Sequence, residues 1–545
     1  RLSKTEYVLT LALWCPIRAS RQGNPPSLTQ KDTNPLCNPC MSLNYNFIWL
    51  LCYLLVLVGL AGYGFHRLSI VYLYWKNRNN KPQPKARFQE LPVVTVQLPM
   101  FNEKFVVDRL LESVAALDYP QDKLEIQILD DSTDDTTEQC YRKVEELKSR
   151  GFDAICIHRT DRTGFKAGAL EAATKVAKGE FLLILDADFV PEPDLLQKTI
   201  HFFTDENVGL VQTRWGHINR EYNLLTRIQG MYLDGHFAME QTARNRSGRF
   251  FTFNGTAGIW RKCVIGDAGG WSHDTLTEDM DLSYRVQLKG WRFIYLNDVV
   301  TPAELPVDMD GFKSQQHRWT KGSIQVCQKI LLDIWRSNAP LKAKVEATTH
   351  LTCNYSYLLL ALLCFLVYPI CTQRIPENET VFMWFVNVAL FFMTSVAVCI
   401  FYMSAQIVVR PKSWWKELPY LPLLLTLSVG MAVNNAKAVL EAIFGHQSAF
   451  VRTPKYGVDR KEDRRHVSQL KRNGYRAIKS VVIPVLEIAC GTFFLNLIII
   501  MIRQGHYLSP ILMIPFLGFY YTGFCSLGRM ISNLLPAKQT AKAKN

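Results

Sequence analysis

The positions of apolar residues divide the chain into three parts. Residues 47–75 form one apolar run, and a helix of about 20 such residues crosses a bilayer. From residue 91 to residue 340, apolar and polar positions are mixed as in a soluble protein. Residues 345–533 consist again mostly of long apolar runs. The pattern therefore predicts one domain outside the bilayer, with membrane segments on both sides of it.

The middle part alternates between two kinds of pattern. Short apolar runs that end at polar residues are typical of buried strands, and amphipathic stretches of helical period lie between them. Such a series predicts an α/β domain with a mostly parallel sheet and helices on both faces. The expected strands are 93–98, 125–129, 151–158 and 181–185, and the expected helices are 106–117, 136–149, 166–176 and 282–288.

Basic residues set the expected orientation of the apolar segments, because Lys and Arg collect on the cytosolic side of a membrane. Five of them lie between residues 76 and 87, which places the middle domain in the cytosol. Ten more lie between residues 445 and 479, and Arg410 and Lys412 belong on the same side. We expect five spans and one re-entrant or interfacial segment, 420–444; six spans would place the ten charges outside. The five expected spans are 47–75, 350–371, 381–409, 478–502 and 507–534.

These patterns also give the expected domain boundaries. Residues 1–40 form a polar, Pro- and Asn-rich N-terminal extension, and we expect the reading frame to start at Met41. A signal peptide over the apolar residues 7–14 is the alternative. The other parts are a first span with its basic linker (41–80), the cytosolic domain (81–340), membrane and interfacial helices (341–534) and a basic tail (535–545). Within them, residues 324–335 predict an amphipathic helix, either on the membrane face or in the core.

Composition excludes some classes of function. The net charge of +14 would suit a nucleic-acid partner, but the densest basic stretches adjoin apolar segments. We therefore expect a lipid bilayer as partner and no nucleic acid. The 14 cysteines are scattered, and the CxxC pair of Cys37 and Cys40 has no second pair to complete a zinc site. No disulfide framework is visible, which fits a reducing cytosol.

Acidic pairs follow two of the expected strands. Asp130 and Asp131 come after residues 125–129, and Asp186 and Asp188 come after residues 181–185. The carboxyl ends of parallel strands form the edge of an open sheet where ligands bind. Two carboxylates one residue apart suit a hard divalent cation carried on a diphosphate. Asp130 and Asp131 fit the N-cap of a helix equally well.

A basic and aromatic signal, Gln315-Gln316-His317-Arg318-Trp319, follows the last expected helix of the domain. The guanidinium of Arg318 offers a fork of donors that binds a diphosphate in bidentate fashion. Trp319 offers a flat apolar face. A surface arginine beside a core tryptophan is the alternative interpretation.

Taken together, the DxD of residues 186–188, Thr277-Glu278-Asp279 and the QxxRW of residues 315–319 resemble the processive family 2 glycosyltransferases, the cellulose synthase group. Residues 212–215, 234–237 and 253–261 further resemble the plant cellulose synthase-like mannan and glucan synthases and their bacterial relatives. Residues 320–323 differ from the plant types, which leaves the sugar open. The resemblance implies a GT-A domain, a Rossmann-like nucleotide-sugar domain, joined to an α-helical transmembrane region.

The resemblance also implies a role for each motif. Asp279, beside Glu278, is the catalytic general base, and Asp186 and Asp188 hold Mg²⁺ or Mn²⁺. Residues 450–455, within the expected loop 445–460, resemble the FxVTxK gating loop, with Arg452 where the family has Val; a plain basic linker is the alternative. The implied donor-binding residues are Asp130, Asp131, Lys166, Asp186, Asp188, Gln315, Arg318, Thr453 and Lys455, and the implied acceptor-binding residues are Phe253, Asn254, Gly255, Thr256 and Trp319.

The implied function is that of a membrane-embedded inverting β-glycosyltransferase. It would add hexoses from UDP-glucose or GDP-mannose to a growing β-1,4-linked polysaccharide and pass the polymer through its own spans. Two alternatives stay open: a single-transfer glycolipid synthase of the ceramide glucosyltransferase kind, and an inactive channel or scaffold. Accessory subunits or a second copy are further expected partners. The expected location is a bacterial inner membrane, or the Golgi or plasma membrane of a eukaryote, with several spans and a cytosolic catalytic domain.

Overall fold

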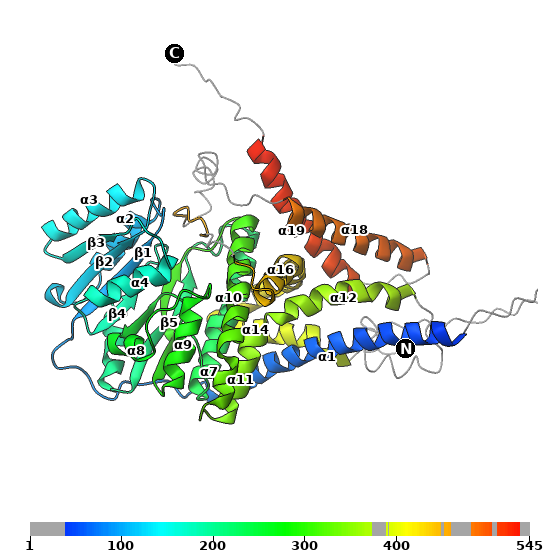
Figure 1. Cartoon of the computed structure of the whole chain (residues 1–545), viewed down its shortest axis with the longest axis horizontal. Helices are drawn as coiled ribbons and strands as arrows, with labels where there is room; N and C mark the ends of the chain where they lie inside the picture. The colour runs from blue at the N-terminus through cyan, green and yellow to red at the C-terminus, as the bar shows by residue number, and fades with distance from the viewer. Residues whose placement is uncertain are drawn as a thin grey trace, which may run out of the picture.

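The computed structural model describes residues 39–372, 389–390, 392–447, 452–458, 481–503 and 510–534. An α/β domain lies at one end of the molecule and a region of long helices at the other (Figure 1). Most of the expected N-terminal extension and the whole basic tail lie outside the described residues.

The α/β domain is built on a seven-stranded sheet with the order β3-β2-β1-β4-β6-β5-β7. β6 pairs antiparallel with both of its neighbours, whereas the other pairs are parallel, so the sheet is mixed and mostly parallel. Its strands are β1 (Val94–Met100), β2 (Leu124–Asp130), β3 (Asp153–His158), β4 (Phe181–Ile184), β5 (Val208–His217), β6 (Gly258–Arg261) and β7 (Arg292–Ala303).

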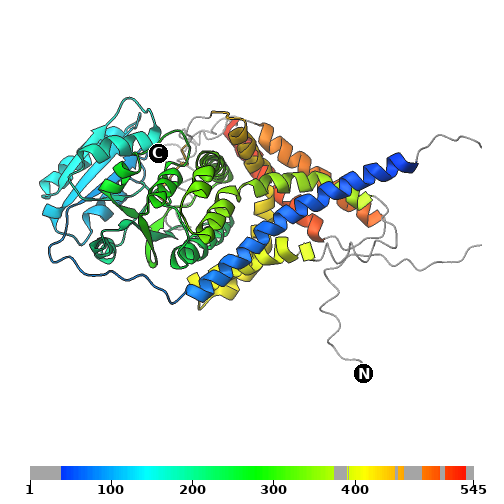
Figure 2. The same cartoon turned by 60° about the horizontal axis from the view of Figure 1, so that its bottom comes forward.

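Helices cover both faces of the sheet (Figures 1 and 2). Most of them are short, and two stretches of 3₁₀-helix and one of π-helix, labelled η, interrupt the series. In chain order they are α2 (Val107–Ala115), η1 (Gln121–Lys123), α3 (Thr136–Ser149), α4 (Phe165–Val176), α5 (Leu195–Thr199), η2 (Ile200–Thr204), α6 (Leu224–Asp234), η3 (Gly235–Gln241), α7 (Thr242–Arg246), α8 (Lys262–Asp267) and α9 (Glu278–Leu288).

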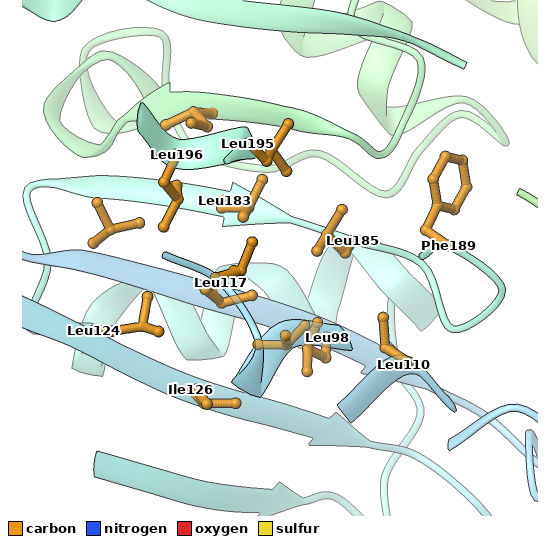
Figure 3. Packing of buried hydrophobic residues seen from close by; sticks show 14 of the residues in the cluster. Leu98, Leu110, Leu117, Leu124, Ile126, Leu183, Leu185, Phe189, Leu195 and Leu196 are labelled. Carbon is orange, nitrogen blue, oxygen red and sulfur yellow. The ribbon is translucent and has the colours of Figure 1, made fainter. Parts of the chain in front are cut away.

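The continuous apolar run of β4 is explained by cores on both faces of the sheet. Leu183 and Leu185 point into the core that holds Leu98 of β1 and Leu110 of α2 (Figure 3). Leu182 belongs to the other core, beneath α4 and α9. Successive side chains of a strand face opposite ways, so a strand covered on both sides is apolar at every position. Each such side chain contributes about 1.5–3 kcal/mol on burial.

The four expected strands and the three expected helices between them are confirmed to within two residues at most ends, and α3 spans residues 136–149 as predicted. The antiparallel strand β6 and the strands β5 and β7 were not predicted. β5 and β7 carry polar positions such as Gln212 and Asn297 inside their runs, and their pairing contains two register shifts. These interruptions hide the alternation of apolar and polar positions by which a strand is recognised in a sequence.

The helical region contains long apolar helices beside α1 (Figure 2). By length and composition, the described residues hold two candidate spans, 48–77 and 482–503, or up to four if two bent helix pairs each count as one. The bends are 53° between α11 and α12 and 41° between α15 and α16. The helices are α1 (Pro39–Asn77), α10 (Met309–Arg336), α11 (Leu341–Thr352), α12 (Tyr355–Thr372), η4 (Phe392–Val396), α14 (Ala397–Val409), η5 (Trp414–Tyr420), α15 (Leu421–Gly430), α16 (Ala432–Ile443), α18 (Val482–Arg503) and α19 (Pro510–Leu534).

The break between α15 and α16 falls in the middle of the segment expected to be re-entrant or interfacial, and it suits a broken span as well as a re-entrant segment. The expected number and orientation of spans therefore stay predictions. Residues 381–388 of one expected span lie outside the described residues.

The expected helix at residues 324–335 is the second half of α10, which also carries the QxxRW signal. One side of this half is core, because Val326 and Ile334 are buried. The other side is open: Leu332 is 64% exposed and Trp335 is 46% exposed. The helix is thus amphipathic, and α10 as a whole lies between the α/β domain and the helical region (Figure 1).

A buried ion pair joins α10 to the last two helices. Lys313 Nζ donates to Glu487 Oε2 of α18 at 2.5 Å, and to the Thr522 carbonyl and Ser526 Oγ of α19 at 3.0 Å and 2.9 Å. The Lys313 side chain is 3% exposed and that of Glu487 is fully buried. Removal of one partner of such a pair leaves an uncompensated buried charge.

Replacement of Lys313 by Met should therefore destabilise the protein by about 3–5 kcal/mol, because Glu487 is left without its counter-ion. The measurement is the thermal unfolding midpoint of the full chain in detergent. The matched control is the double variant Lys313→Met/Glu487→Met, which should recover much of the loss. Equal midpoints for the wild type and the single variant would contradict this view of the pair.

Candidate active site

The acidic residues at the end of β2, Asp130 and Asp131, lie at the carboxyl edge of the sheet. Asp130 Oδ2 accepts from Thr137 Oγ1 at 2.7 Å and lies 2.7 Å from His158 Nδ1. Asp131 binds Arg159 through two hydrogen bonds of 2.8 Å and 2.6 Å. The N-cap position of α3 is Asp135, so the interpretation of Asp130 and Asp131 as helix caps is wrong.

The two carboxylates of the DxD each meet a lysine. Asp186 Oδ1 accepts from Lys166 Nζ, and Lys166 also donates to the Gly255 carbonyl at 2.8 Å. Asp188 Oδ2 accepts from Lys455 Nζ at 2.5 Å. Burial alone would lower the pKa of Lys166, but Asp186 and the carboxylates of the Thr277-Glu278-Asp279 motif outweigh it and raise that pKa. Lys166 therefore carries a positive charge at the centre of the site.

Residues 452–458 lie on the same edge of the sheet. Lys455 donates to the Glu304 carbonyl at 2.9 Å, and the Glu304 carboxylate accepts from the backbone N–H groups of Tyr456 at 2.9 Å and Val458 at 3.1 Å. Arg452 donates to the Phe101 carbonyl at 2.6 Å. The rest of the expected gating loop, residues 448–451 and 459–460, lies outside the described residues.

Thr453 is buried beside the first turn of α10, since a Cβ added at Gly311 would lie 3.8 Å from its methyl group. The segment 452–458 therefore contacts both the DxD and the helix that carries QxxRW.

The Phe253-Asn254-Gly255-Thr256 segment ties the DxD to the expected base. The backbone N–H of Asp186 donates to Thr256 Oγ1 at 2.8 Å, and that of Phe253 donates to Ser283 Oγ of α9 at 2.9 Å. Gly255 has a φ of +81°, and a Cβ placed there would lie 3.0 Å from Asp279 Oδ2. This backbone conformation is one that L side chains rarely adopt. Glycine thus lets the chain pass between Lys166 and Asp279.

Asp279 lies in the first turn of α9. Burial, and then the neighbouring Glu278 carboxylate, raise the pKa of Asp279 to about 7. The Met280 N–H, which donates to Oδ1 at 2.8 Å, acts in the opposite direction, as do Lys166 and Arg318. A carboxylate with a pKa near neutrality is suited to act as a general base.

The three residues of the QxxRW signal, Gln315, Arg318 and Trp319, lie on neighbouring positions of the α10 surface. Gln315 and Trp319 are half-buried and four residues apart, so they share a face of the helix. The ring of Trp319 lies 6.5 Å from that of Trp215, at an angle of 61°. α10 packs against the Thr277-Glu278-Asp279 motif, since a Cβ added at Gly322 would meet the Thr277 side chain, and the charge of Arg318 lowers the pKa of Asp279. The structure therefore brings the QxxRW helix to the edge where the DxD and Asp279 lie.

A cavity of about 400 Å³ opens beside Lys166 and Glu278, within the range of about 300–1,000 Å³ typical of ligand sites. It lies between the start of α4, the loop before α9, and α10. Its lining residues are Gly164, Phe165, Lys166, Ala167, His273, Asp274, Thr275, Leu276, Glu278, Gln325 and Gln447.

Three further residues, Arg159, Glu304 and Gln241, belong to the site although no sequence motif identified them, and His236 lies within residues 234–237, whose resemblance to the plant synthases implied no role for it. Arg159 holds Asp131, Glu304 holds the segment 452–458, and His236 and Gln241 contact the Asn254 side chain. The last two come from the π-helix η3, and a π-turn leaves no period in the sequence that we could have used.

The donor set at the DxD fits a divalent cation. Carboxylate oxygens are the ligands that Mg²⁺ and Mn²⁺ prefer, and Asp186 and Asp188 supply them. Among the described residues, no three His, Cys, Asp or Glu side chains gather in a metal-binding arrangement. The two carboxylates therefore need further oxygens, which the diphosphate of a nucleotide can provide.

Comparisons with known proteins agree with this geometry. Residues 92–322 match the family model described as Glycosyltransferase like family 2. Glucomannan 4-beta-mannosyltransferase 2 of Arabidopsis thaliana is 42% identical over 286 residues, which are 50% of this chain and 53% of that protein. Glucomannan 4-beta-mannosyltransferase 1 of Oryza sativa subsp. japonica is 41% identical over 277 residues, with the same shares of 50% and 53%. The chain spans about half the length of the curated relatives it matches.

A solved structure shares the fold. A mannosyltransferase from Pyrobaculum calidifontis, in complex with GDP-Man and Mn²⁺, superposes with a TM-score of 0.51 at 20% identity. The superposition covers 72% of this chain and 100% of that one. This likeness shows a GT-A-like fold with a mixed, mostly parallel sheet.

Replacement of Gly255 by Ala should destabilise the protein by about 1–2 kcal/mol, since a left-handed backbone conformation costs an L residue that much. The crowding of Asp279 adds to this cost. We expect the thermal midpoint to fall by a few degrees. Gly266→Ala in α8 is the matched control, because a Cβ there meets nothing within 4 Å, and it should not lower the midpoint. An unchanged midpoint for Gly255→Ala would show that the turn relaxes without strain.

Proposed function

We propose that the protein is a membrane-embedded inverting β-glycosyltransferase that extends a β-1,4-linked polysaccharide; the match of residues 92–322 to the glycosyltransferase family 2 model supports this proposal. The observation that carries this proposal is the convergence on Gly255: Lys166, which also binds Asp186, donates to its carbonyl, and Asp279 lies against its Cα. The names of the two plant relatives favour GDP-mannose as donor, with UDP-glucose as the second candidate.

The donor would lie along the carboxyl edge of the sheet. Its nucleoside would lie near Asp130 and Asp131, and its diphosphate near the DxD, where Lys166, Arg318 and Lys455 add positive charge. Asp186 and Asp188 would hold Mg²⁺ or Mn²⁺, and that cation, when bound, would neutralise part of the charge on the leaving diphosphate. Thr453 and Gln315 would complete the donor site.

The acceptor would place its terminal sugar on the face of Trp319, with the segment 253–256 beside it. Asp279 takes the proton of the acceptor hydroxyl as that oxygen attacks the anomeric carbon of the donor. The bond from this carbon to the diphosphate oxygen breaks on the opposite side, and the configuration inverts. Fixed positions of base, acceptor and donor supply much of the rate by orientation.

The product would leave through the helical region. Tyr232 packs in the same apolar cluster as Trp319. It also lines a small cavity with Gln316 of α10 and Tyr357 of α12. We infer that the polymer passes from Trp319 along these aromatic side chains into the bilayer region. The catalytic domain would face the cytosol of a multi-pass protein, in a bacterial inner membrane or in the Golgi or plasma membrane, alone or with a second copy or accessory subunits.

Membranes that contain the full chain should convert labelled GDP-mannose into a long polymer when Mg²⁺ or Mn²⁺ is added, and a β-1,4-mannanase should degrade this polymer. UDP-glucose, offered in parallel, tests the second donor. A single labelled sugar on lipid would instead favour a glycolipid synthase. No transfer from either donor, in membranes that bind the nucleotide, would favour a scaffold.

Replacement of Asp279 by Asn should lower the rate of transfer by about 10²–10⁴-fold, because general-base catalysis contributes that much. Binding of the nucleotide diphosphate should stay within twofold. Asp298→Asn, which alters an exposed carboxylate paired with Lys81, is the control and should keep wild-type activity. Retained transfer by Asp279→Asn would remove the base assignment.

The rate of the wild-type protein should depend on pH through the same group. The pKa of Asp279 is raised to about 7, so its carboxyl is protonated and inactive as a base below this pH and ionised above it. The kcat/KM for the acceptor should therefore rise with pH up to about 7 and then level off. In Asp279→Asn the residual activity should lack this limb, and a persistent limb would assign it to another group.

A further inference from the structure

The π-helix η3 directs two polar side chains, Gln241 and His236, toward the acceptor segment, and a third, Glu240, toward His236. Gln241 Nε2 donates to Asn254 Oδ1 at 2.7 Å, and Asn254 Nδ2 lies 3.0 Å from His236 Nε2. His236 Nδ1 lies 3.1 Å from Glu240 Oε2. Both ends of the Asn254 amide are thus engaged by one short stretch of π-helix, which is a rare structure that often marks functional sites.

The heavy-atom contacts favour one tautomer of His236. Gln241 donates to the Asn254 oxygen, so the Asn254 nitrogen faces His236 and donates to Nε2. The ring nitrogen Nε2 is then an acceptor, and the proton of the neutral imidazole is on Nδ1, where it is donated to Glu240. Burial, and then the charges of Arg244 and Arg67, lower the pKa of His236 to about 3, which keeps the ring neutral.

Glu240 connects this group to the first long helix. It forms ion pairs with Arg67 of α1 and, at 3.1 Å, with Arg244 of α7. Arg244 Nε in turn donates to Glu346 Oε1 of α11 at 2.9 Å, and Glu346 pairs with His66 of α1 at 3.0 Å.

These charges are shielded from water: the side chains of Arg244, Glu346 and Glu240 are 1%, 5% and 7% exposed. Two successive polar residues, His66 and Arg67, thus lie within a candidate span and face the protein interior. Ionisable residues in such a position are costly and mark function by default.

The position of Asn254 fixes the backbone at the centre of the site. The next residue, Gly255, accepts from Lys166 and lies against Asp279. Gln241 also donates to the Thr252 carbonyl at 2.8 Å, so η3 holds the acceptor segment at two points. Displacements of about 1 Å at a reacting centre can lower a rate by about 100-fold.

We propose that His236 and Arg67 are positioning residues, which act through the buried polar chain Asn254–His236–Glu240–Arg67 to hold the acceptor segment in register with the membrane helix α1. The placement of α1 in the bilayer then sets the distance between the acceptor and Asp279. The expected effect on the transfer rate rests on the proposed function. The structural link between α1 and residues 252–257 does not.

The test uses the full chain in lipid nanodiscs and four variants. His236→Leu removes both hydrogen bonds of the ring, and His236→Gln keeps an acceptor for Asn254 and a donor for Glu240. Arg67→Gln removes the charge at the α1 end. Lys76→Gln, which changes another basic residue of α1 outside the buried polar chain, is the matched control.

His236→Leu should lower the rate at saturating donor by about tenfold, and Arg67→Gln by about threefold, because each removes one or two net hydrogen bonds or ion pairs. His236→Gln should restore the rate to within about threefold of the wild type. Binding of the nucleotide diphosphate should stay within twofold in every variant, because the residues of the donor edge do not belong to the buried polar chain. Loss of nucleotide binding together with the rate would indicate general misfolding and overturn the proposal.

Amide hydrogen exchange of residues 252–257 supplies the measurement that does not need activity. Exchange should accelerate in His236→Leu and Arg67→Gln and stay at the wild-type level in Lys76→Gln. If the wild type transfers no sugar, the proposed function fails, and the exchange data still decide the structural link. If residues 252–257 of Arg67→Gln exchanged at the wild-type rate, the link to α1 would be overturned, whether or not the protein transfers sugar.

Discussion

The site depends on one close approach of the backbone at Gly255. A glycine with positive φ allows Lys166 to reach its carbonyl at 2.8 Å while the Asp279 carboxylate lies where a side chain would otherwise be. The same lysine binds Asp186, so the proposed donor-site carboxylate and the proposed base, Asp279, share one cationic neighbour. Such proximity makes their charges interdependent: burial and Glu278 raise the pKa of Asp279, and Lys166 limits the rise. The sheet and the helices on it place Lys166, Gly255 and Asp279 at one point of the sheet edge.

α10 joins this edge to the helical region (Figure 1). It starts at the segment that contains Thr453, carries Arg318 and Trp319 in its middle, and is anchored by Lys313 on α18 and α19 and by Lys321, which donates to Glu441 of α16 at 3.1 Å. Membrane-side helices thus hold both flanks of the QxxRW signal. The domain and the helical region act as one structure at this helix, although their sequences differ sharply in composition.

The sequence predicted the parts whose signals are local. The strands β1 to β4 were recognisable because their apolar runs are short and continuous, and the motif acids follow them directly. β6, with four residues, and β5, with Gln212 inside its run, gave no comparable pattern. Contacts between distant residues were equally hidden: Lys455 and Asp188 are 267 positions apart, and nothing in the sequence shows that Lys455 donates to Asp188. The contact of His236 with Asn254 was not predicted, although residues 234–237 belong to the resemblance, because a π-turn shifts the helical period by which we judge which residues share a face.

The continuity of α10 has a mechanical consequence. Lys313 and Trp319 are separated by six residues, or about 9 Å of helix at 1.5 Å per residue. Because this stretch is regular helix, it contains no joint that could absorb a displacement. If α18 tilted against its neighbours, the ion pair of Glu487 with Lys313 would move α10, and with it the indole of Trp319. If the protein is membrane-embedded as proposed, the thickness and lateral pressure of the surrounding lipid would therefore act on the position of Trp319, the proposed sugar-binding residue.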